Sequence, residues 1–382
     1  MPPFGACETQ NRGTTCFVNA AVQVSCEVNT PRVRTNKLTL LLSPCLFLVP
    51  VFSTLQAVFT LARLLLRATW VSILHFRLIV AGCVRNEYFP NCLHRYKAGE
   101  VPQAEDSVDM NREIAFLIHK ILSADSSTAI RPQRLLENLP QISHQFQTRR
   151  QEDAHEFFSQ LLDKMERDAA SKKLPKCELF NGSLVSRVVC SQCHLKSDTI
   201  DPFSTLSVGI HRCTELSECL SCFFSTETLS GDNAFECSSC STHVDAEKQT
   251  YFKSLPDILT IQLKRFHHGD FIKDNHLVAF PETLNLFERL LPERRMTDNN
   301  TSSADTTETL TESQCWYDLT GILVHVGYTI LSGHYYAFVR LVKEDGTVEF
   351  RKMDDQTVDT VGRNVAMCAE AYMLLYERRT SE

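Results

Sequence analysis

Cys16 is the residue whose surroundings best suit nucleophilic chemistry. Thr14 or Thr15 can cap the N-terminus of a predicted helix, which places the cysteine in or next to the first turn. The backbone N–H groups and the macrodipole at that end favour the thiolate and therefore lower the pKa of the thiol. Asn11, five residues upstream, could aim its side-chain amide at an oxyanion that forms over the same helix end. The alternative is that Cys16, one of 16 cysteines, is a small apolar residue that fills a gap in the core.

A thiolate nucleophile also needs a general base, and the base needs a partner that orients it. His334 has the most suggestive setting of the thirteen histidines, because it follows Gly333 and opens a predicted strand. That strand runs to a hairpin signal at positions 345–346, and the next strand returns to Asp354 and Asp355. A turn centred between these two positions would pair position 334 with position 357, three positions beyond Asp354. We therefore predict a bulge or a longer loop that absorbs the offset. Considered separately, the histidine and the aspartates could also be polar residues in water.

Three Cys-x-x-Cys pairs indicate metal ligation. They are Cys190/Cys193, Cys219/Cys222 and Cys237/Cys240. The first and third pairs lie 44 positions apart at predicted strand ends, as in a zinc ribbon. Four thiolates complete a tetrahedral Zn²⁺ site with no open position, so we predict a structural ion that takes no part in chemistry. The middle pair could compete as one of the two, although its surroundings are typical of a buried helix face. His194 is a weaker alternative ligand.

The composition is that of a globular protein. Of 382 residues, 43% are hydrophobic and 22% are charged, which excludes wholesale disorder and fibrous repeats. The net charge of -7 argues against a protein built to grip phosphates, so we predict no nucleic-acid partner. The first ten residues contain neither a basic segment nor an apolar run. We therefore expect no export signal, reduced cysteines and a cytoplasmic or nuclear location.

The order of the predicted elements indicates an α+β fold. Amphipathic helices are expected over residues 108–122 and 151–165, and from about residue 177 the hydrophobic period shifts toward that of strands. Residues 296–313 are rich in Thr, Ser, Asn and Asp, and we expect a flexible surface insertion there. Residues 38–62 carry no charge and are long enough to cross a bilayer, but two prolines disfavour one clean helix. A membrane span is therefore not our expectation.

Together these pieces resemble the ubiquitin-specific proteases, a family of papain-like deubiquitinases. Residues 11–23 are similar to the nucleophile box of that family, and residues 151–157 to its Gln-Gln-Asp-Ala-x-Glu-Phe box. Further matches are residues 255–266 with its Leu-Lys-Arg-Phe strand, 333–337 and 354–358 with its histidine box, 371–376 with its closing strand, and the paired Cys-x-x-Cys motifs with its zinc ribbon. The matches occur in the family's order along almost the whole chain, and jointly they are very specific.

The resemblance implies an α+β, papain-like thumb–palm–fingers fold with a zinc-ribbon fingers subdomain. The catalytic domain would span residues 8–380. A mainly helical thumb would occupy residues 8–175, the fingers residues 176–255 and the palm strands residues 256–380.

The resemblance also implies a catalytic role for each candidate. Cys16 would be the nucleophile, His334 the base and Asp354 the carboxylate that orients the base. Asn11 would be the oxyanion donor, and Asp355 an auxiliary or alternative third member. The implied reaction is hydrolysis of the isopeptide or peptide bond after the last glycine of ubiquitin, through an acyl-enzyme on Cys16.

Substrate and metal contacts follow from the same resemblance. Asp153 would face the basic stem of the ubiquitin tail, and the slim backbone from Gly333 to Tyr335 would line a channel for the tail's terminal glycines. Cys190, Cys193, Cys237 and Cys240 would hold the structural Zn²⁺ of the fingers. The implied partners are ubiquitin and ubiquitinated proteins.

One segment departs from the family pattern. Residues 24–56 interrupt the helix that carries Cys16, and residues 57–64 would continue that helix directly. Both ends of the insert are translatable from splice-site sequences, so we hypothesise that it is translated intron, with residues 70–82 as a less clear second case. Three alternatives to an active deubiquitinase stay open. The first is a catalytically impaired ubiquitin-binding module, favoured if the insert deforms the thumb, and the second is a membrane-anchored form of either. The third is a protease for a ubiquitin-like modifier, because the sequence does not show which modifier surface the fingers meet.

Overall fold

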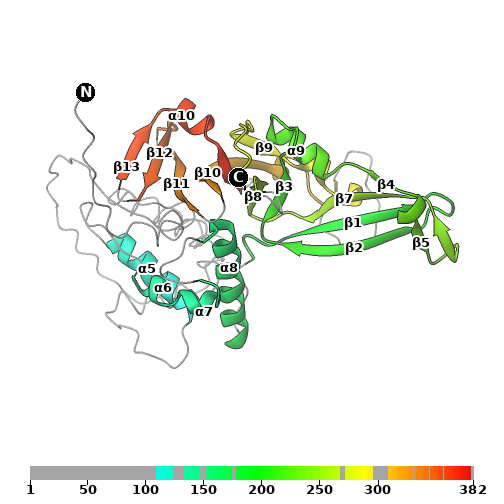
Figure 1. The fold of residues 1–382 in the computed structure, drawn as a ribbon, viewed down its shortest axis with the longest axis horizontal. Coiled ribbons are helices and arrows are strands. Elements are labelled where there is room, and N and C mark those ends of the chain that lie inside the picture. Colours follow the sequence, from blue (N-terminus) through cyan, green and yellow to red (C-terminus); the bar gives the residue numbers. More distant parts are fainter. Residues whose placement is uncertain are drawn as a thin grey trace, which may run out of the picture.

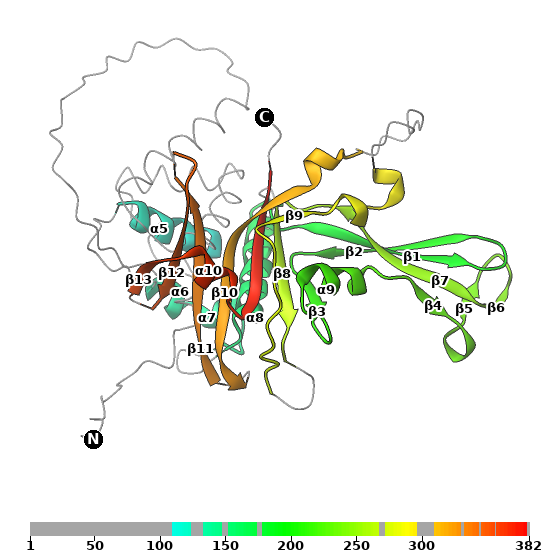
Figure 2. The ribbon, with the colours of Figure 1, turned by 90° about the horizontal axis from the view of Figure 1, so that it is seen from above.

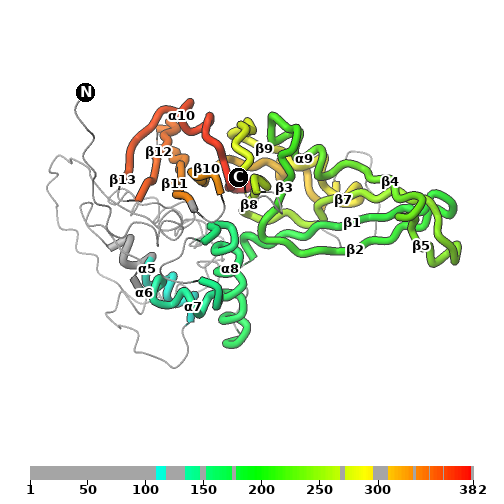
Figure 3. Tube along the Cα trace, viewed as in Figure 1, coloured from blue at the N-terminus to red at the C-terminus, as the bar shows by residue number. Residues whose placement is uncertain are grey.

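A computed structural model describes residues 109–123, 133–146, 152–173, 178–266, 272–295, 309–329, 332–343, 345–355 and 357–379. Cys16, Asn11 and the insert over residues 24–56 lie outside these ranges. Figure 3 follows the described chain from the helices through the green fingers strands to the orange and red strands of the palm.

Helices come first in the described chain. They are α5 (Met110–Ser123), α6 (Gln133–Glu137), α7 (Leu139–Ile142) and α8 (Ala154–Ser171). The helix α8 buries one face because Phe157, Leu161 and Met165 recur at helical spacing. The helices predicted over residues 108–122 and 151–165 are thus confirmed, with boundaries shifted by a few residues.

The palm is one large sheet. Its strand order is β13-β12-β11-β10-β14-β8-β3, and β9 (Thr283–Asn285) pairs with β10 outside this path. The strands are β3 (Leu206–Gly209), β8 (Ile258–Lys264), β10 (Trp316–Thr329), β11 (Ser332–Val342), β12 (Val348–Asp354), β13 (Thr357–Val361) and β14 (Ala371–Arg378). All neighbours are antiparallel except β3 and β8.

Each face of the palm sheet packs against its own hydrophobic core, because alternate side chains of a strand point to opposite faces. On β11, Tyr335 and Ala337 belong to the core beneath helices α5–α8, whereas Phe338 belongs to the opposite core. That second core is closed by α9 (Leu216–Phe223), and α10 (Arg363–Met367) contributes Ala366 to it. In Figure 2 the palm strands lie in front of the helices α5–α8, and the fingers extend to the right.

The fingers project away from the helices (Figure 1). They contain a four-stranded sheet of order β2-β1-β7-β4 and a small β5-β6 hairpin. The strands are β1 (Gly182–Cys190), β2 (Lys196–Phe203), β4 (Glu227–Leu229), β5 (Phe235–Cys237), β6 (Thr242–Val244) and β7 (Ala246–Ser254). The β1 strand ends at Cys190 and β5 ends at Cys237, so each places a metal-ligand motif at the same end of the fingers.

Four short 3₁₀ helices complete the described elements. They are η1 (Gly231–Asn233), η2 (Phe287–Arg289), η3 (Pro292–Arg294) and η4 (Glu312–Cys315). Of the predicted insertion over residues 296–313, residues 309–313 are described, and there Leu310 is buried and bridges to Arg295. Among the helices of the described ranges, none is long and apolar enough to cross a membrane.

Candidate active site

The strands β11 and β12 bring His334 and Asp354 together. The imidazole Nε2 and the carboxylate Oδ1 lie 2.6 Å apart, and both side chains are partly exposed. The carboxylate thereby holds the ring in one orientation and directs Nδ1 away from itself. This is the relation between a general base and its orienting partner.

The strand register explains how these two residues meet, and it corrects one prediction. The β11–β12 ladder runs without interruption from Ala337 opposite Met353 to Val342 opposite Val348. Continued to the open end, this register places position 334 opposite position 356, two positions from Asp354. An even offset leaves both side chains on the same face, as diagonal neighbours. The predicted longer loop is present, because the strands stay hydrogen-bonded as far as Lys343 and Thr347 and the hairpin is centred on Asp345 rather than after it. This loop absorbs one of the three positions and not all of them, and the diagonal contact of the two side chains spans the other two.

Lys352 is a third member of this cluster that the sequence reasoning missed. Its ammonium donates to Oδ2 of Asp354 at 2.7 Å and lies 4.3 Å from the ring centroid of Tyr336. Burial alone would raise the pKa of Asp354, but the hydrogen bonds from Lys352 and His334 outweigh it and hold that pKa below its usual range. The available signal was the spacing: residues two apart on a strand share a face, so a lysine at 352 had to lie beside position 354.

Asp355, the predicted auxiliary carboxylate, lies in the turn between β12 and β13. Asp354 pairs with Thr357 across this turn, and Asp355 adopts a φ of 51°. Aspartate tolerates this left-handed conformation better than most residues, which accounts for its type at this position. Its Oδ1 is buried without a hydrogen-bond partner. The carboxylate that contacts His334 is that of Asp354.

Gly333 lies against His325 on the neighbouring strand β10. A Cβ atom at position 333 would lie 2.1 Å from Nε2 of His325 and 2.7 Å from the carbonyl oxygen of Val326. Only glycine fits this approach. The His325 ring is 2% exposed, and burial, with the charge of Lys273, lowers its pKa to about 4. His325 is therefore a neutral packing residue beside the base.

Asp153 and Tyr335 are both predicted to contact the substrate, and in the structure they contact each other. The Tyr335 hydroxyl donates to Oδ2 of Asp153 at 3.4 Å, and the hydroxyl of Tyr372 donates to the same oxygen at 2.6 Å. Oδ1 of Asp153 accepts from the backbone N–H of Glu156 and so caps α8. Asp153 and both tyrosines are buried.

The four predicted zinc ligands converge at the tip of the fingers. The Sγ atoms of Cys190 and Cys240 are 3.9 Å apart, those of Cys193 and Cys237 are 3.5 Å apart, and all four lie within 4.8 Å of one another. A tetrahedral ion with Zn–S bonds of about 2.3 Å requires sulfur atoms about 3.8 Å apart, so this donor set fits Zn²⁺.

The backbone of the two Cys-x-x-Cys motifs has the same shape. The residue after each second cysteine lies in the left-handed region, with a φ of 57° at His194 and 55° at Ser241. Each also donates its N–H to the carbonyl of the first cysteine, Cys190 or Cys237. The competing pair lies elsewhere: Cys219 is buried on α9, where burial raises the pKa of its thiol to about 12.

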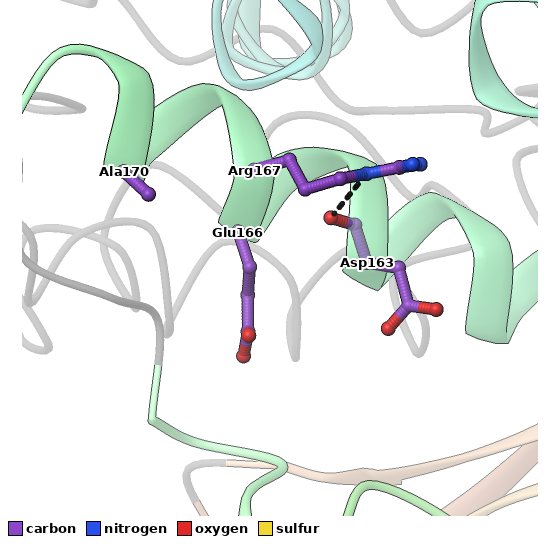
Figure 4. A pocket seen from close by; sticks show the side chains of 4 residues that line it. All are labelled: Asp163, Glu166, Arg167 and Ala170. Carbon is purple, nitrogen blue, oxygen red and sulfur yellow. Dashed lines mark hydrogen bonds between the residues drawn. The ribbon is translucent and has the colours of Figure 1, made fainter.

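A hollow of about 290 Å³ lies along the outer side of α8, lined by Asp163, Glu166, Arg167 and Ala170 (Figure 4). The guanidinium Nε of Arg167 donates to the carbonyl oxygen of Asp163 at 3.3 Å. Glu166 accepts a hydrogen bond from the side chain of Asn181. These lining residues include neither a nucleophile nor an imidazole, so the hollow has no part in the chemistry of His334.

The model of one protein family matches most of the chain. It describes ubiquitin carboxyl-terminal hydrolases, and it covers residues 53–376. The chain belongs to this family, that of the ubiquitin-specific proteases. The match begins after Cys16, so the predicted nucleophile box precedes the matched residues.

Relatives of this chain occur in fungi, plants and animals. The probable ubiquitin carboxyl-terminal hydrolase 16 of Schizosaccharomyces pombe is 33% identical over 267 residues, which are 67% of this chain and 53% of that protein. Ubiquitin carboxyl-terminal hydrolase 23 of Arabidopsis thaliana is 32% identical over 65% of this chain and 28% of its own length. Human ubiquitin carboxyl-terminal hydrolase 42 is 29% identical over 65% of this chain and 18% of its own length. The chain thus spans about half or less of the length of these relatives.

Solved structures show the same fold. A chain in the SAGA Ubp8/Sgf11/Sus1/Sgf73 DUB module bound to ubiquitin aldehyde superposes with a TM-score of 0.62 and 26% identity, covering 80% of this chain and 67% of that chain. A chain of the same module bound to monoubiquitin superposes with a TM-score of 0.60 and 25% identity. The expected α+β thumb–palm–fingers fold is thereby confirmed.

Proposed function

We propose that the protein is a cysteine deubiquitinase that hydrolyses the isopeptide or peptide bond after the C-terminal glycine of ubiquitin. The contact between His334 and Asp354 at 2.6 Å carries this proposal, because it supplies an oriented base on the palm of a ubiquitin-specific protease. Membership of a hydrolase family and the likeness to modules bound to ubiquitin aldehyde and monoubiquitin support the choice of substrate.

The mechanism assigns one proton path. Asp354 occupies Nε2 of His334, so Nδ1 is the ring atom that accepts the proton from the Cys16 thiol. The thiolate sulfur attacks the carbonyl carbon of the terminal glycine of ubiquitin, and Asn11 donates to the resulting oxyanion. The C–N bond then breaks, and the imidazolium gives its proton to the leaving amine. His334 next takes a proton from water, whose oxygen attacks the carbonyl carbon of the thioester. The C–S bond then breaks, the imidazolium returns its proton to the sulfur of Cys16, and ubiquitin leaves with a free C-terminal carboxyl group, which ionises.

Zinc has a structural place in this proposal. Cys190, Cys193, Cys237 and Cys240 would hold the ion, which when bound would supply a closed, four-thiolate cross-link between the two Cys-x-x-Cys motifs at the tip of the fingers. Such a site keeps no position for substrate or water, so every catalytic proton moves through the chain's own residues. Zinc-bound and free thiols both suit a reducing compartment, and we propose a cytoplasmic or nuclear location with ubiquitinated proteins as targets.

An electrophilic ubiquitin probe tests the function on the full chain. Ubiquitin that carries a thiol-reactive group at its C-terminus should form one covalent adduct, and the Cys16→Ala variant should form none. Absence of an adduct from the full chain, together with an adduct from a chain that lacks residues 24–56, would show that the insert impairs the enzyme. Ubiquitin binding without capture in both chains would overturn the proposed activity and leave a ubiquitin-binding module. Capture of a ubiquitin-like modifier in preference to ubiquitin would redirect the substrate assignment.

A further inference from the structure

Lys273 is a buried lysine that takes no part in the proposed proton path. Its side chain is only 2% exposed. The ammonium donates to the backbone carbonyl oxygen of His325 at 2.6 Å and to Oε2 of Glu370 at 3.0 Å. Burial of an ammonium costs free energy unless hydrogen bonds and an opposite charge compensate for the lost water. The fold supplies both here, so this position is built for a charged lysine.

The backbone at Lys273 lies along the end of strand β10. The N–H of Lys273 donates to the carbonyl oxygen of Tyr328 at 2.9 Å, and Ile272 forms an antiparallel bridge with Thr329. The neighbouring strand β14 pairs with β10 over residues 317–319. Lys273 and the residue before it therefore contact β10 beyond that pairing, at the end where β10 lies beside the strand of the catalytic base.

A second buried cation holds the segment that carries Lys273. The guanidinium of Arg265, the residue after strand β8, donates to the carbonyl oxygens of Asp274 and His276 at 2.9 and 2.8 Å. It also donates to the carbonyl oxygen of Ala371, the first residue of β14, at 2.7 Å. The segment is thus fixed to β8 and β14 on one side, and the Lys273 ammonium reaches from it to β10.

His325 connects the ammonium to the catalytic base. Its ring lies so close to Gly333 that a Cβ atom there would be 2.1 Å from Nε2. The next residue of β10, Val326, pairs with His334 across the ladder. A displaced carbonyl at position 325 would therefore move both the ring and the strand segment that pairs with the base. The ammonium holds β10 at the residue before that pair.

We propose that Lys273 is a positioning residue whose ammonium, neutralised by Glu370, holds the carbonyl of His325 and so fixes the end of β10 against the strand of His334. The inference rests on the proposed function, because His334 is the base of that reaction. With almost no exposed surface, the Lys273 side chain acts through His325 rather than on the substrate. A methionine at this position has a similar length but no donor, so it would leave the carbonyl and the Glu370 carboxylate without this hydrogen bond.

Amide hydrogen exchange on the full chain tests the anchoring without ubiquitin. In Lys273→Met, exchange should become about tenfold faster over residues 325–335, while the fingers strands β1 and β7 keep their protection. Glu370→Gln should change the same residues less, and it carries the test if Lys273→Met does not fold. Lys164→Met is the matched control, because Lys164 is a largely buried lysine that pairs with Asp168 on α8, and it should leave residues 325–335 unchanged. Unchanged exchange at residues 325–335 in both test variants, or equal acceleration there and in the fingers, would overturn the anchoring.

A kinetic experiment separates positioning from substrate contact. Because a small misplacement of reacting groups costs rate, Lys273→Met should lower kcat for a ubiquitin fusion about tenfold with KM within about twofold, whereas Lys164→Met should change neither. Glu370→Gln should lower kcat less. In the double variant of Lys273 and Glu370 the loss should not exceed that of Lys273→Met alone, because the two residues act as one unit.

Two kinetic results contradict the proposal. One is a Lys273→Met defect confined to KM, which would mean that the lysine supports substrate binding. The other is a double variant whose loss in kcat equals the product of the two single losses, which would mean that Glu370 and Lys273 act independently. If the chain does not turn over ubiquitin at all, the proposed function fails, and the exchange experiment still decides whether Lys273 anchors β10.

Discussion

His334 and Asp354 are in hydrogen-bond contact, Nε2 to Oδ1 at 2.6 Å, although they do not stand directly opposite each other on their two strands. They are diagonal neighbours on one face of the β11–β12 pair, a separation that long polar side chains bridge. The ammonium of Lys352 donates a hydrogen bond to the second carboxylate oxygen, Oδ2, at 2.7 Å, so each oxygen of Asp354 binds one partner. This arrangement determines the first two predictions.

Removal of the base should abolish turnover. We expect His334→Ala to lower kcat for a ubiquitin fusion by about four orders of magnitude, since the members of such a unit act together. Asp354→Asn keeps the size of the side chain but loses its charge, and we expect a loss of about 10²- to 10⁴-fold. Asp359→Asn, the same change at an exposed position of β13, is the control and should leave kcat unchanged. An Asp354→Asn enzyme with full activity would remove this carboxylate from the mechanism.

Loss of the Lys352 charge should raise the pKa of Asp354. In the folded protein that pKa is held low, so the ionised carboxylate stabilises the fold above the ordinary carboxyl range, and this contribution is lost as pH falls through the folded pKa. In Lys352→Met the loss should begin at a higher pH, and the acid limb of the activity profile should move in the same direction. A ¹³C titration of the aspartates and a pH–rate profile measure the two effects. Lys352→Arg should preserve both.

The control for this change is Lys343→Met, which removes a lysine that pairs with Glu349 near the other end of the same hairpin. Lys343→Met should leave the pKa of Asp354 unchanged. An unchanged titration in Lys352→Met as well would show that the ammonium has no influence on the carboxylate.

Gly333→Ala should damage the site through His325. The added Cβ would lie 2.1 Å from Nε2 of the histidine, so the β10 and β11 strands must separate next to His334. We expect a destabilisation of about 1–3 kcal/mol in urea unfolding together with lower turnover. The His325→Ala change removes the obstructing ring, and in that background Gly333→Ala should cost less. If Gly333→Ala lowered the stability equally in both backgrounds, the ring of His325 would not be the reason that position 333 requires glycine.

Zinc removal should affect the fingers before the palm. We expect one tightly held Zn²⁺ for each chain by metal analysis, lost when Cys237 and Cys240 are both replaced by serine. Proteolysis should then cut within the fingers, while the palm strands stay protected. Cys222→Ser alters an exposed cysteine of the α9 pair and should retain the metal. A double variant that keeps its zinc would refute this ligand set.

The sequence by itself determined those features that depend only on residues close together in the chain. The α8 helix follows from the recurrence of Phe157, Leu161 and Met165, and the start of β10 follows from the alternation of apolar and polar residues over 317–320. The zinc ligands were predictable because a Cys-x-x-Cys motif already places two thiols close together, so only the pairing of two motifs had to be inferred.

Only the tertiary structure decided how distant segments meet. The offset between His334 and Asp354 is two positions rather than three, because the centre of a hairpin depends on the conformation of its turn and not on its residue types alone. The position of Asp153 shows the same dependence on tertiary structure more strongly. Its hydrogen-bond partner Tyr372 is 219 positions away in the chain, and no local sequence pattern relates the two residues. Whether a carboxylate is buried among hydroxyls or open to a basic tail depends on which elements pack over it, and that packing exists only in the folded chain.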